Sequence, residues 1–323
     1  MPATRPRGPL PGILAPLLAS ALLLLACTAS EGALPEPATP TPSPTATAAP
    51  LPSPTPTATA VPDVPARGEG TRTLPAVDPA LQSAIEAALG GEVGSYGVVA
   101  WNLSTGTGAA VNPDKVFYAA SLFKLPLMHE AFRQRELGLL DFSETLEVTE
   151  EVAAEDLGTL EQAGIAVGDL VPVSRLLELM VTWSDNTSAV LLHQRLGGRN
   201  VDAGLRELGL TSTSVNTREL PTTAGDMAAL LRAVAAGEAV SSQASAEMEA
   251  LLLAQRVRDR IPAGVPRGVR VGNKTANWEN ATHDVAIVYA PAGTYVLAVL
   301  SDKPGDAATL VRISRLVYQH FNP

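Results

Sequence analysis

The sequence has 323 residues, a formal net charge of −10 at pH 7, 46% hydrophobic residues and only 4% aromatic residues. This length allows one large domain or two small ones, and the acidic balance, with no basic stripe, argues against nucleic acid as a partner. The single cysteine excludes an internal disulfide. The four histidines are scattered without metal-ligand spacing, so we expect no metal and no other cofactor.

Residues 1–26 have the layout of a secretory signal peptide, because two arginines precede an apolar run that ends in a small residue, Ala26. The run is interrupted by prolines and is short for a membrane span. The only cysteine, Cys27, follows directly, and residues 24–27 resemble the cleavage box of a bacterial lipoprotein. We therefore expect export across the cytoplasmic membrane and a lipid anchor on Cys27 at the extracytoplasmic face. The alternative is an ordinary signal peptide followed by an incidental cysteine.

Residues 27–74 begin with this cysteine and continue as Pro, Thr, Ala and Ser with almost no large apolar side chains. Such a segment cannot bury a core, so it is predicted to be a disordered stalk. Its reach is about 140 Å if roughly 47 residues are fully extended. We expect the stalk to lift a domain, residues 75–323, off the membrane, and we expect that domain to fold by itself.

The domain is predicted to start with a helix, since Asp78 can cap the first turn and Pro79 suits the first helical position. Two strands are predicted next, then a helical block, three strands and a final helix. This order indicates an α+β fold. The expected strands are 96–103, 109–112, 269–275, 284–289 and 294–301, and the expected later helices are the run that opens at 121, then 172–183, 187–196, 201–208, 223–235, 244–255 and 307–321.

Ser121 and Lys124 are three residues apart at the start of an apolar, helix-like run. On a helix this spacing places both side chains on one face. A serine becomes a good nucleophile when a base takes its proton, and a lysine can be that base when apolar neighbours lower its pKa by desolvation. By itself, however, such a pair is more often a helix cap followed by a surface lysine.

Two later stretches change this interpretation, because residues 184–186 read Ser-Asp-Asn and residues 274–276 read Lys-Thr-Ala. The ordered set S-x-x-K, S-D-N and K-T-G is the signature of class A β-lactamases and penicillin-binding proteins. From about residue 78 to its end, the chain resembles this serine-hydrolase family. The resemblance implies an antiparallel sheet of five strands with flanking helices, an all-helical second lobe, and a catalytic cleft between the two.

The resemblance also implies a role for each residue of the first two motifs. Ser121 would be the nucleophile that forms an acyl-enzyme, and Lys124 would be its base or part of a proton relay. Ser184 would carry a proton to the leaving nitrogen. Asn186 would hold Lys124 and a substrate amide, whereas Asp185 would brace the loop.

The third motif is implied to bind the substrate. Lys274 would supply positive charge, and Thr275 a hydroxyl group, for a substrate carboxylate. The oxyanion hole would combine the backbone N–H groups of Ser121 and Asn277.

Two features depart from the family pattern. Ala276 stands where the family has glycine, and its methyl group is expected to alter substrate fit without abolishing activity. The loop that carries the family's water-activating glutamate corresponds to residues 211–223, and here it is a dozen or so residues short. Its only acid, Glu219, is one candidate general base; the alternative is an ion pair with Arg218 or Arg206. Without a placed base, acylation is expected to occur while deacylation is slow.

The first hypothesis is therefore an extracytoplasmic, monomeric serine hydrolase that opens β-lactam amides through an acyl-Ser121 intermediate. The second is a carboxypeptidase or esterase of the same fold that acts on cell-wall peptides. The third is a penicillin- or peptidoglycan-binding module without turnover. The intact Ser121, Lys124, Ser184 and Lys274 count against the third, whereas the short loop and Ala276 count against efficient β-lactamase activity.

Overall fold

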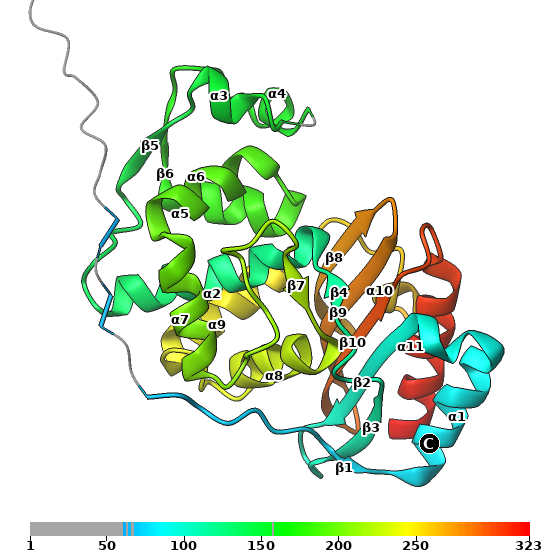
Figure 1. The fold of residues 1–323 in the computed structure, drawn as a ribbon. Helices are drawn as coiled ribbons and strands as arrows, with labels where there is room; N and C mark the ends of the chain where they lie inside the picture. Colours follow the sequence, from blue (N-terminus) through cyan, green and yellow to red (C-terminus); the bar gives the residue numbers. More distant parts are fainter. Residues whose placement is uncertain (1–60, 63, 66–67, 157) are drawn as a thin grey trace, which may run out of the picture. The chain divides into compact units, whose positions relative to one another are not determined.

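The computed structural model describes residues 61–62, 64–65, 68–156 and 158–323. Its main sheet has six strands (Figure 1). Neighbouring strands pair antiparallel except β1, which runs parallel to β3. The five antiparallel strands are those predicted; β1 is an addition, because two residues carry no alternating pattern. In spatial order the strands are β1 (Ala76–Val77), β3 (Thr107–Val111), β2 (Tyr96–Asn102), β10 (Gly293–Ser301), β9 (Ala281–Ala290) and β8 (Arg270–Trp278).

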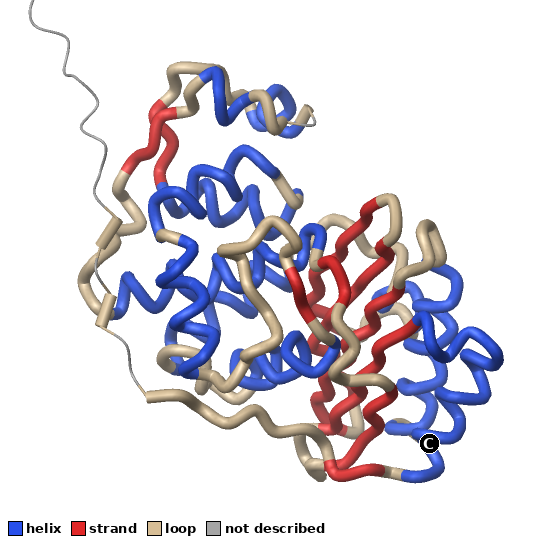
Figure 2. Tube along the Cα trace, viewed as in Figure 1, coloured by secondary structure: helices blue, strands red, loops and turns tan. Residues whose placement is uncertain are grey.

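Alternate residues of the central strands belong to two different hydrophobic clusters, as the two-residue period of a strand requires. Val98 and Val299 belong to the smaller cluster, which includes residues of α1 (Pro79–Leu89) and α11 (Ala307–Phe321). Val99 and Ala298 belong to the larger cluster, which includes α8 (Ala224–Ala235) and extends through the helical lobe. The sheet is therefore covered by helices on both faces (Figure 2).

The predicted helical block forms a second lobe beside the sheet (Figure 2). Among the described residues, no helix is both long and apolar enough to cross a membrane. The predicted signal peptide, Cys27 and the predicted stalk before residue 61 lie outside the described residues. The remaining helices are α2 (Lys124–Glu136), α3 (Glu150–Ala153), α4 (Thr159–Ala163), α5 (Val173–Glu178), α6 (Asn186–Leu196), α7 (Gly198–Glu207), α9 (Ser242–Leu253) and α10 (Ile261–Gly264), and the short strand pairs are β4 (Phe117–Tyr118) with β7 (Pro221–Thr222) and β5 (Thr145–Glu147) with β6 (Leu170–Pro172).

The described residues before β1 lie against the folded domain, although the composition up to residue 74 predicted a free stalk. Val64 is buried, and the carbonyl of Pro65 accepts a hydrogen bond from Arg133 (3.0 Å). The N–H of Gly70 donates to the carbonyl of Arg206 (2.9 Å). Residues before 75 therefore contact the domain, because a segment without apolar periodicity can still dock through its backbone and a few side chains. The boundary at residue 75 stays a prediction.

Arg72 adds a charged contact to this docking. Its guanidinium donates to the carboxylate of Asp226 (2.8 Å), which is only 1% exposed, and it also pairs with the more exposed Asp114. Asp226 in turn accepts hydrogen bonds from the N–H of Ser212 and the hydroxyl of Thr213. Arg72 therefore compensates a buried charge that holds the start of the short loop.

We expect a chain that begins at residue 75 to unfold at a lower temperature than a chain that begins at residue 61. Removal of Arg72 leaves the buried carboxylate of Asp226 without its cation, which costs about 1–3 kcal/mol. Each kcal/mol corresponds to about 2–4 °C in a domain of this size. Calorimetry of the two chains should therefore show a difference in Tm of several degrees.

Arg72→Gln in the longer chain should reproduce most of this loss. The matched control is Arg199→Gln, which removes an exposed arginine and should leave Tm nearly unchanged. Equal melting temperatures for the two chain lengths would show that residues 61–74 contribute nothing to stability, and the stalk would then extend to residue 74 as first expected.

Candidate active site

Ser121 lies in a single 3-10 turn, Ala120–Phe123, that continues directly into α2 at Lys124. The Oγ of Ser121 and the Nζ of Lys124 are 3.3 Å apart, so the three-residue spacing does bring the two side chains together. Ala120 has a φ of +43°, a conformation that costs a residue with a Cβ on the order of 1–3 kcal/mol. The nucleophile is therefore held in a strained turn at the start of a buried helix.

Lys124 is fully buried, and burial lowers the pKa of its ammonium group to about 7, although the charge of Asp185 partly opposes this shift. Its Nζ lies 2.5 Å from the carbonyl oxygen of Ser184 and 2.7 Å from Oδ1 of Asn186. Both partners can only accept, so they occupy the two N–H groups of a neutral amine. The remaining lone pair is available to the hydroxyl of Ser121, which is the geometry that a general base requires.

Ser184 is positioned by an irregular helix end. The predicted helix before it is regular over α5 and then widens into a π-helical turn, Leu179–Trp183. Ser184 follows with a φ of +63°. Asp185 is buried and caps α6 by accepting the N–H of Ser188 (2.6 Å), so it braces this turn through its side chain.

Lys274 approaches Ser184 from β8, the strand at the edge of the sheet. Its Nζ is 2.9 Å from the Oγ of Ser184, and the Nζ of Lys124 is 3.2 Å from the same oxygen. Burial and then repulsion from Lys124 lower the pKa of Lys274, while the charge of Asp284 opposes them. One hydroxyl group therefore bridges two buried amines that resist being protonated together.

Arg260 supports this end of β8 and was missed by the sequence analysis. Its guanidinium group, 3% exposed, donates to the carbonyls of Ala276 (2.9 Å) and His283 (2.6 Å) and to Oδ1 of Asn277 (2.8 Å). These bonds hold the strand whose N–H at Asn277 is expected to face the oxyanion. No local pattern reveals Arg260, since its partners lie 16 to 23 residues further along the chain.

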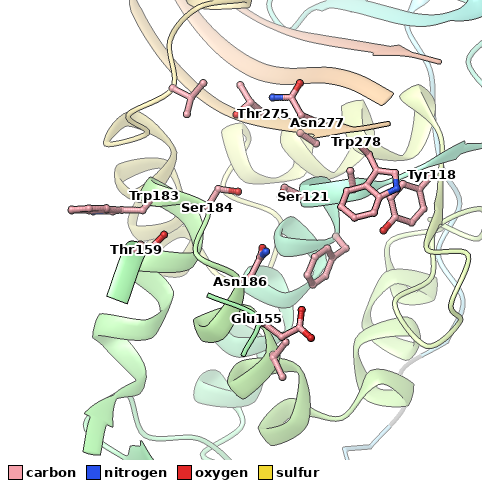
Figure 3. A pocket seen from close by; sticks show the side chains of 15 residues that line it. Tyr118, Ser121, Glu155, Thr159, Trp183, Ser184, Asn186, Thr275, Asn277 and Trp278 are labelled. Carbon is pink, nitrogen blue, oxygen red and sulfur yellow. The ribbon is translucent and has the colours of Figure 1, made fainter. Parts of the chain in front are cut away.

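A cavity of about 440 Å³ opens in front of Ser121, between the edge of the sheet and the helical lobe (Figure 3). Trp278, which is 57% exposed, contacts Tyr118 with 5.9 Å between the ring centroids. The cavity therefore combines reactive polar groups with a broad apolar wall. Its polar lining includes Ser121, Ser184, Asn186, Thr275 and Asn277, and its aromatic lining is Tyr118, Phe123, Trp183 and Trp278.

Ala276, the departure from glycine, also lines this cavity. Its side chain is only 2% exposed and belongs to the larger hydrophobic cluster. The added methyl group is therefore mostly covered by the core, and the altered substrate fit stays a prediction.

Glu219 is not brought to the site. Its side chain is exposed and does not line the cavity. Within the described part of the chain it also makes no ion pair with Arg218 or Arg206. Neither of the two interpretations offered for Glu219 therefore matches its position, and the acid that does line the cavity is Glu155, from the helical lobe.

Leu220 is the loop residue that is anchored beside the nucleophile. Its carbonyl accepts the N–H of Ala119 (2.8 Å), and the next two residues form β7, which pairs with β4. Leu220 has a φ of +40° and is half-buried against the larger hydrophobic cluster. The short loop is thus fastened to the chain just before Ser121, with an apolar residue and no carboxylate at the anchored position.

Residues 80–321 match the model of the β-lactamase enzyme family. The chain belongs to this family. Over 153 residues it is 29% identical to the extended-spectrum β-lactamase PER-1 of Pseudomonas aeruginosa, a match that covers 47% of this chain and only half of that relative.

Several solved structures are similar to this chain over most of its length. PBP-A superposes with a TM-score of 0.71 at 26% identity, over 78% of this chain and 99% of PBP-A. The β-lactamase from Sphaerobacter thermophilus gives 0.67 at 26% identity, over 76% of this chain and 98% of its own. The class A β-lactamase of the last common ancestor of Gram-negative bacteria gives 0.69 at 27% identity, over 75% and 100%. The predicted β-lactamase-like α+β fold is confirmed.

In this β-lactamase-family site, Lys124→Met is expected to stabilise the protein at pH 7 and to weaken the pH dependence of its stability. The folded pKa of about 7 lies below the ordinary value of 10.5. Between these values the unfolded chain binds more protons than the folded chain, so stability rises with pH. The free energy of unfolding of the wild type should therefore rise, relative to Lys124→Met, by up to about 1.4 kcal/mol per pH unit.

Urea unfolding between about pH 7 and pH 9 measures this difference. Lys303→Met is the control, because Glu92 raises the pKa of this partly exposed lysine and its charge does not change in that window. If the wild type and Lys124→Met showed the same slope, Lys124 would be protonated throughout and could not serve as a base.

Proposed function

We propose that this protein is a serine hydrolase that opens β-lactam amides through an acyl-Ser121 intermediate and releases the acyl group slowly. The observation that carries the proposal is the position of Lys124, a buried amine of lowered pKa that lies 3.3 Å from the hydroxyl of Ser121 and 3.2 Å from that of Ser184. An amide bond that enters the cavity meets a nucleophile, a base and a proton donor together.

Acylation follows from these contacts in balanced steps. The Nζ of Lys124 takes the hydroxyl proton of Ser121, and the Oγ bonds to the carbonyl carbon of the lactam. The N–H groups of Ser121 and Asn277 hold the oxyanion that forms. The C–N bond then breaks, and the leaving nitrogen takes the hydroxyl proton of Ser184, which recovers a proton from Lys124 across 3.2 Å.

Through Lys274, the bound substrate affects the protonation state of Lys124, the proposed base. Lys124 and Lys274 repel each other across the hydroxyl of Ser184, so the pair resists full protonation. A substrate carboxylate bound beside Lys274 and Thr275 favours the proton on Lys274 and leaves Lys124 neutral. The site therefore favours amides that carry a carboxylate on the side of the leaving nitrogen, as β-lactams and the C-terminal ends of cell-wall peptides do.

Slow deacylation is proposed because the attacking water needs a base of its own. Glu219 is exposed and outside the cavity, and the anchored position of the loop is Leu220. General-base help is typically worth about 10²–10⁴-fold, so its absence should lengthen the life of the acyl-enzyme by a comparable factor. A mutant of PBP-A has been solved as an acyl-enzyme complex with penicillin G, and a complex of this kind is what we propose for Ser121.

The proposed place of action is the outer face of the cytoplasmic membrane. The support is the sequence alone: an apolar run, then the only cysteine, Cys27, then a long segment rich in Pro and Thr. A lipid on Cys27 would tether the domain, as a monomer, within reach of β-lactams and cell-wall peptides outside the cell.

Incubation with benzylpenicillin is expected to add the mass of one penicillin to the protein and to keep it there for minutes or longer. Intact-mass spectrometry over time measures both the formation and the loss of this adduct. Ser121→Ala should form no adduct, since Ser121 is the assigned nucleophile, whereas Ser143→Ala, at an exposed serine outside the cavity, should behave as the wild type.

Glu219→Gln should leave the lifetime of the adduct unchanged. A much longer lifetime in this variant would identify Glu219 as the base in spite of its exposed position. Rapid and complete turnover by the wild type, insensitive to Glu219→Gln, would mean that another group activates water and would contradict slow deacylation.

Cys27→Ser is expected to release the full-length protein from membranes, because the lipid requires the thiol of this residue. Partition between detergent and aqueous phases after expression in a bacterial host measures the change. Ser30→Ala, three residues further on, is the matched control and should stay in the detergent phase. An unchanged partition of Cys27→Ser would rule out the anchor and leave the ordinary signal peptide.

A further inference from the structure

We propose that Glu155 makes this site selective for zwitterionic substrates, with a carboxylate on the side of the leaving nitrogen and an ammonium group on the acyl side. The inference rests on the proposed function and extends it by naming the charge pattern of the preferred substrate. No sequence motif pointed to Glu155.

Glu155 places an uncompensated negative charge in the cavity. It lies just after α3 in the segment that leaves the helical lobe between β5 and β6, and it lines the cavity together with Thr159. Among the described residues its carboxylate has no ion pair and no hydrogen bond. In Figure 3, Glu155 lies on the opposite side of Ser121 and Ser184 from Thr275.

The fold holds this segment in place from both sides of Glu155. Before it, Val152 is buried in the larger hydrophobic cluster, and its carbonyl accepts the hydroxyl of Thr187 (3.1 Å), next to Asn186 on α6. After it, Leu160 of α4 is buried in the same cluster. The position of Glu155 at the cavity is therefore set by the surrounding structure.

The two ends of the cavity differ in charge. Lys274, bonded to Ser184, and Thr275 mark the side on which the leaving nitrogen receives its proton. The acyl part of the substrate must then extend away from that end, toward Glu155. A carboxylate there attracts an ammonium group and repels an anion. Because the side chain is exposed, the effect should be moderate and should weaken with salt.

Three penicillins test this pattern because they share a benzyl side chain and differ in the charge of one substituent: ampicillin carries an ammonium group, benzylpenicillin none and carbenicillin a carboxylate. The second-order rate constant of acylation should decrease in that order. Attraction and repulsion at an exposed carboxylate together should make ampicillin faster than carbenicillin by about five- to tenfold at low salt. High salt should reduce the ratio.

Glu155→Gln should bring the three rate constants close together, and Glu155→Lys should reverse their order. Glu151→Gln is the matched control, because Glu151 is exposed on α3 and does not line the cavity; it should keep the wild-type order. Equal rate constants in the wild type, or an order that persists in Glu155→Gln, would overturn the role of Glu155 while acyl-Ser121 chemistry stands. Absence of an adduct with all three penicillins would overturn the proposed function and this inference with it.

Discussion

Two buried amines that share one hydroxyl group are the constraint on which the rest of this site depends. Lys124 comes from the helical lobe, Lys274 from the edge strand of the sheet, and Ser184 from the turn between α5 and α6. Burial of an ammonium group is unfavourable, so the packing of the lobe against the sheet must supply the free energy that keeps both amines buried. The same burial leaves Lys124 able to act as a base near neutral pH.

The backbone around this arrangement is strained at three places that meet near the nucleophile. Ala120, Ser184 and Leu220 all have positive φ values, which persist only where the surrounding structure over-determines them. The cap formed by Asp185 directly after Ser184, and the hydrogen bond from the N–H of Ala119 to the carbonyl of Leu220, are two of the contacts that do so. In the proposed mechanism this supporting structure serves acylation, since it positions the residues assigned as nucleophile, base and proton donor. No equivalent contacts position a carboxylate of the short loop at the cavity. The site is therefore better equipped for the proposed acylation than for deacylation.

Several features follow from the sequence alone because they depend on neighbours a few residues apart. The cap at Asp78, the five antiparallel strands and the order of the α+β elements were all predicted correctly. The three short motifs, in their order, also indicated that Ser121 and Lys274 would meet at one site, although a family resemblance and not local physics carried that step. The short length of the loop is likewise visible in the sequence, and the expectation of slow deacylation was drawn from it.

Only the tertiary structure decided which further residues support this site or lie at its edge. Arg260, Glu155 and the docked Arg72 act on partners or spaces that the chain reaches by folding back on itself, and Arg72 is 154 residues from Asp226. The short loop is a second example. Its length is visible in the sequence, but only the pairing of β4 with β7 shows that Leu220, and not Glu219, lies beside Ser121. Local patterns determine elements, whereas contacts between distant elements depend on how their buried faces pack, and no single segment encodes that packing.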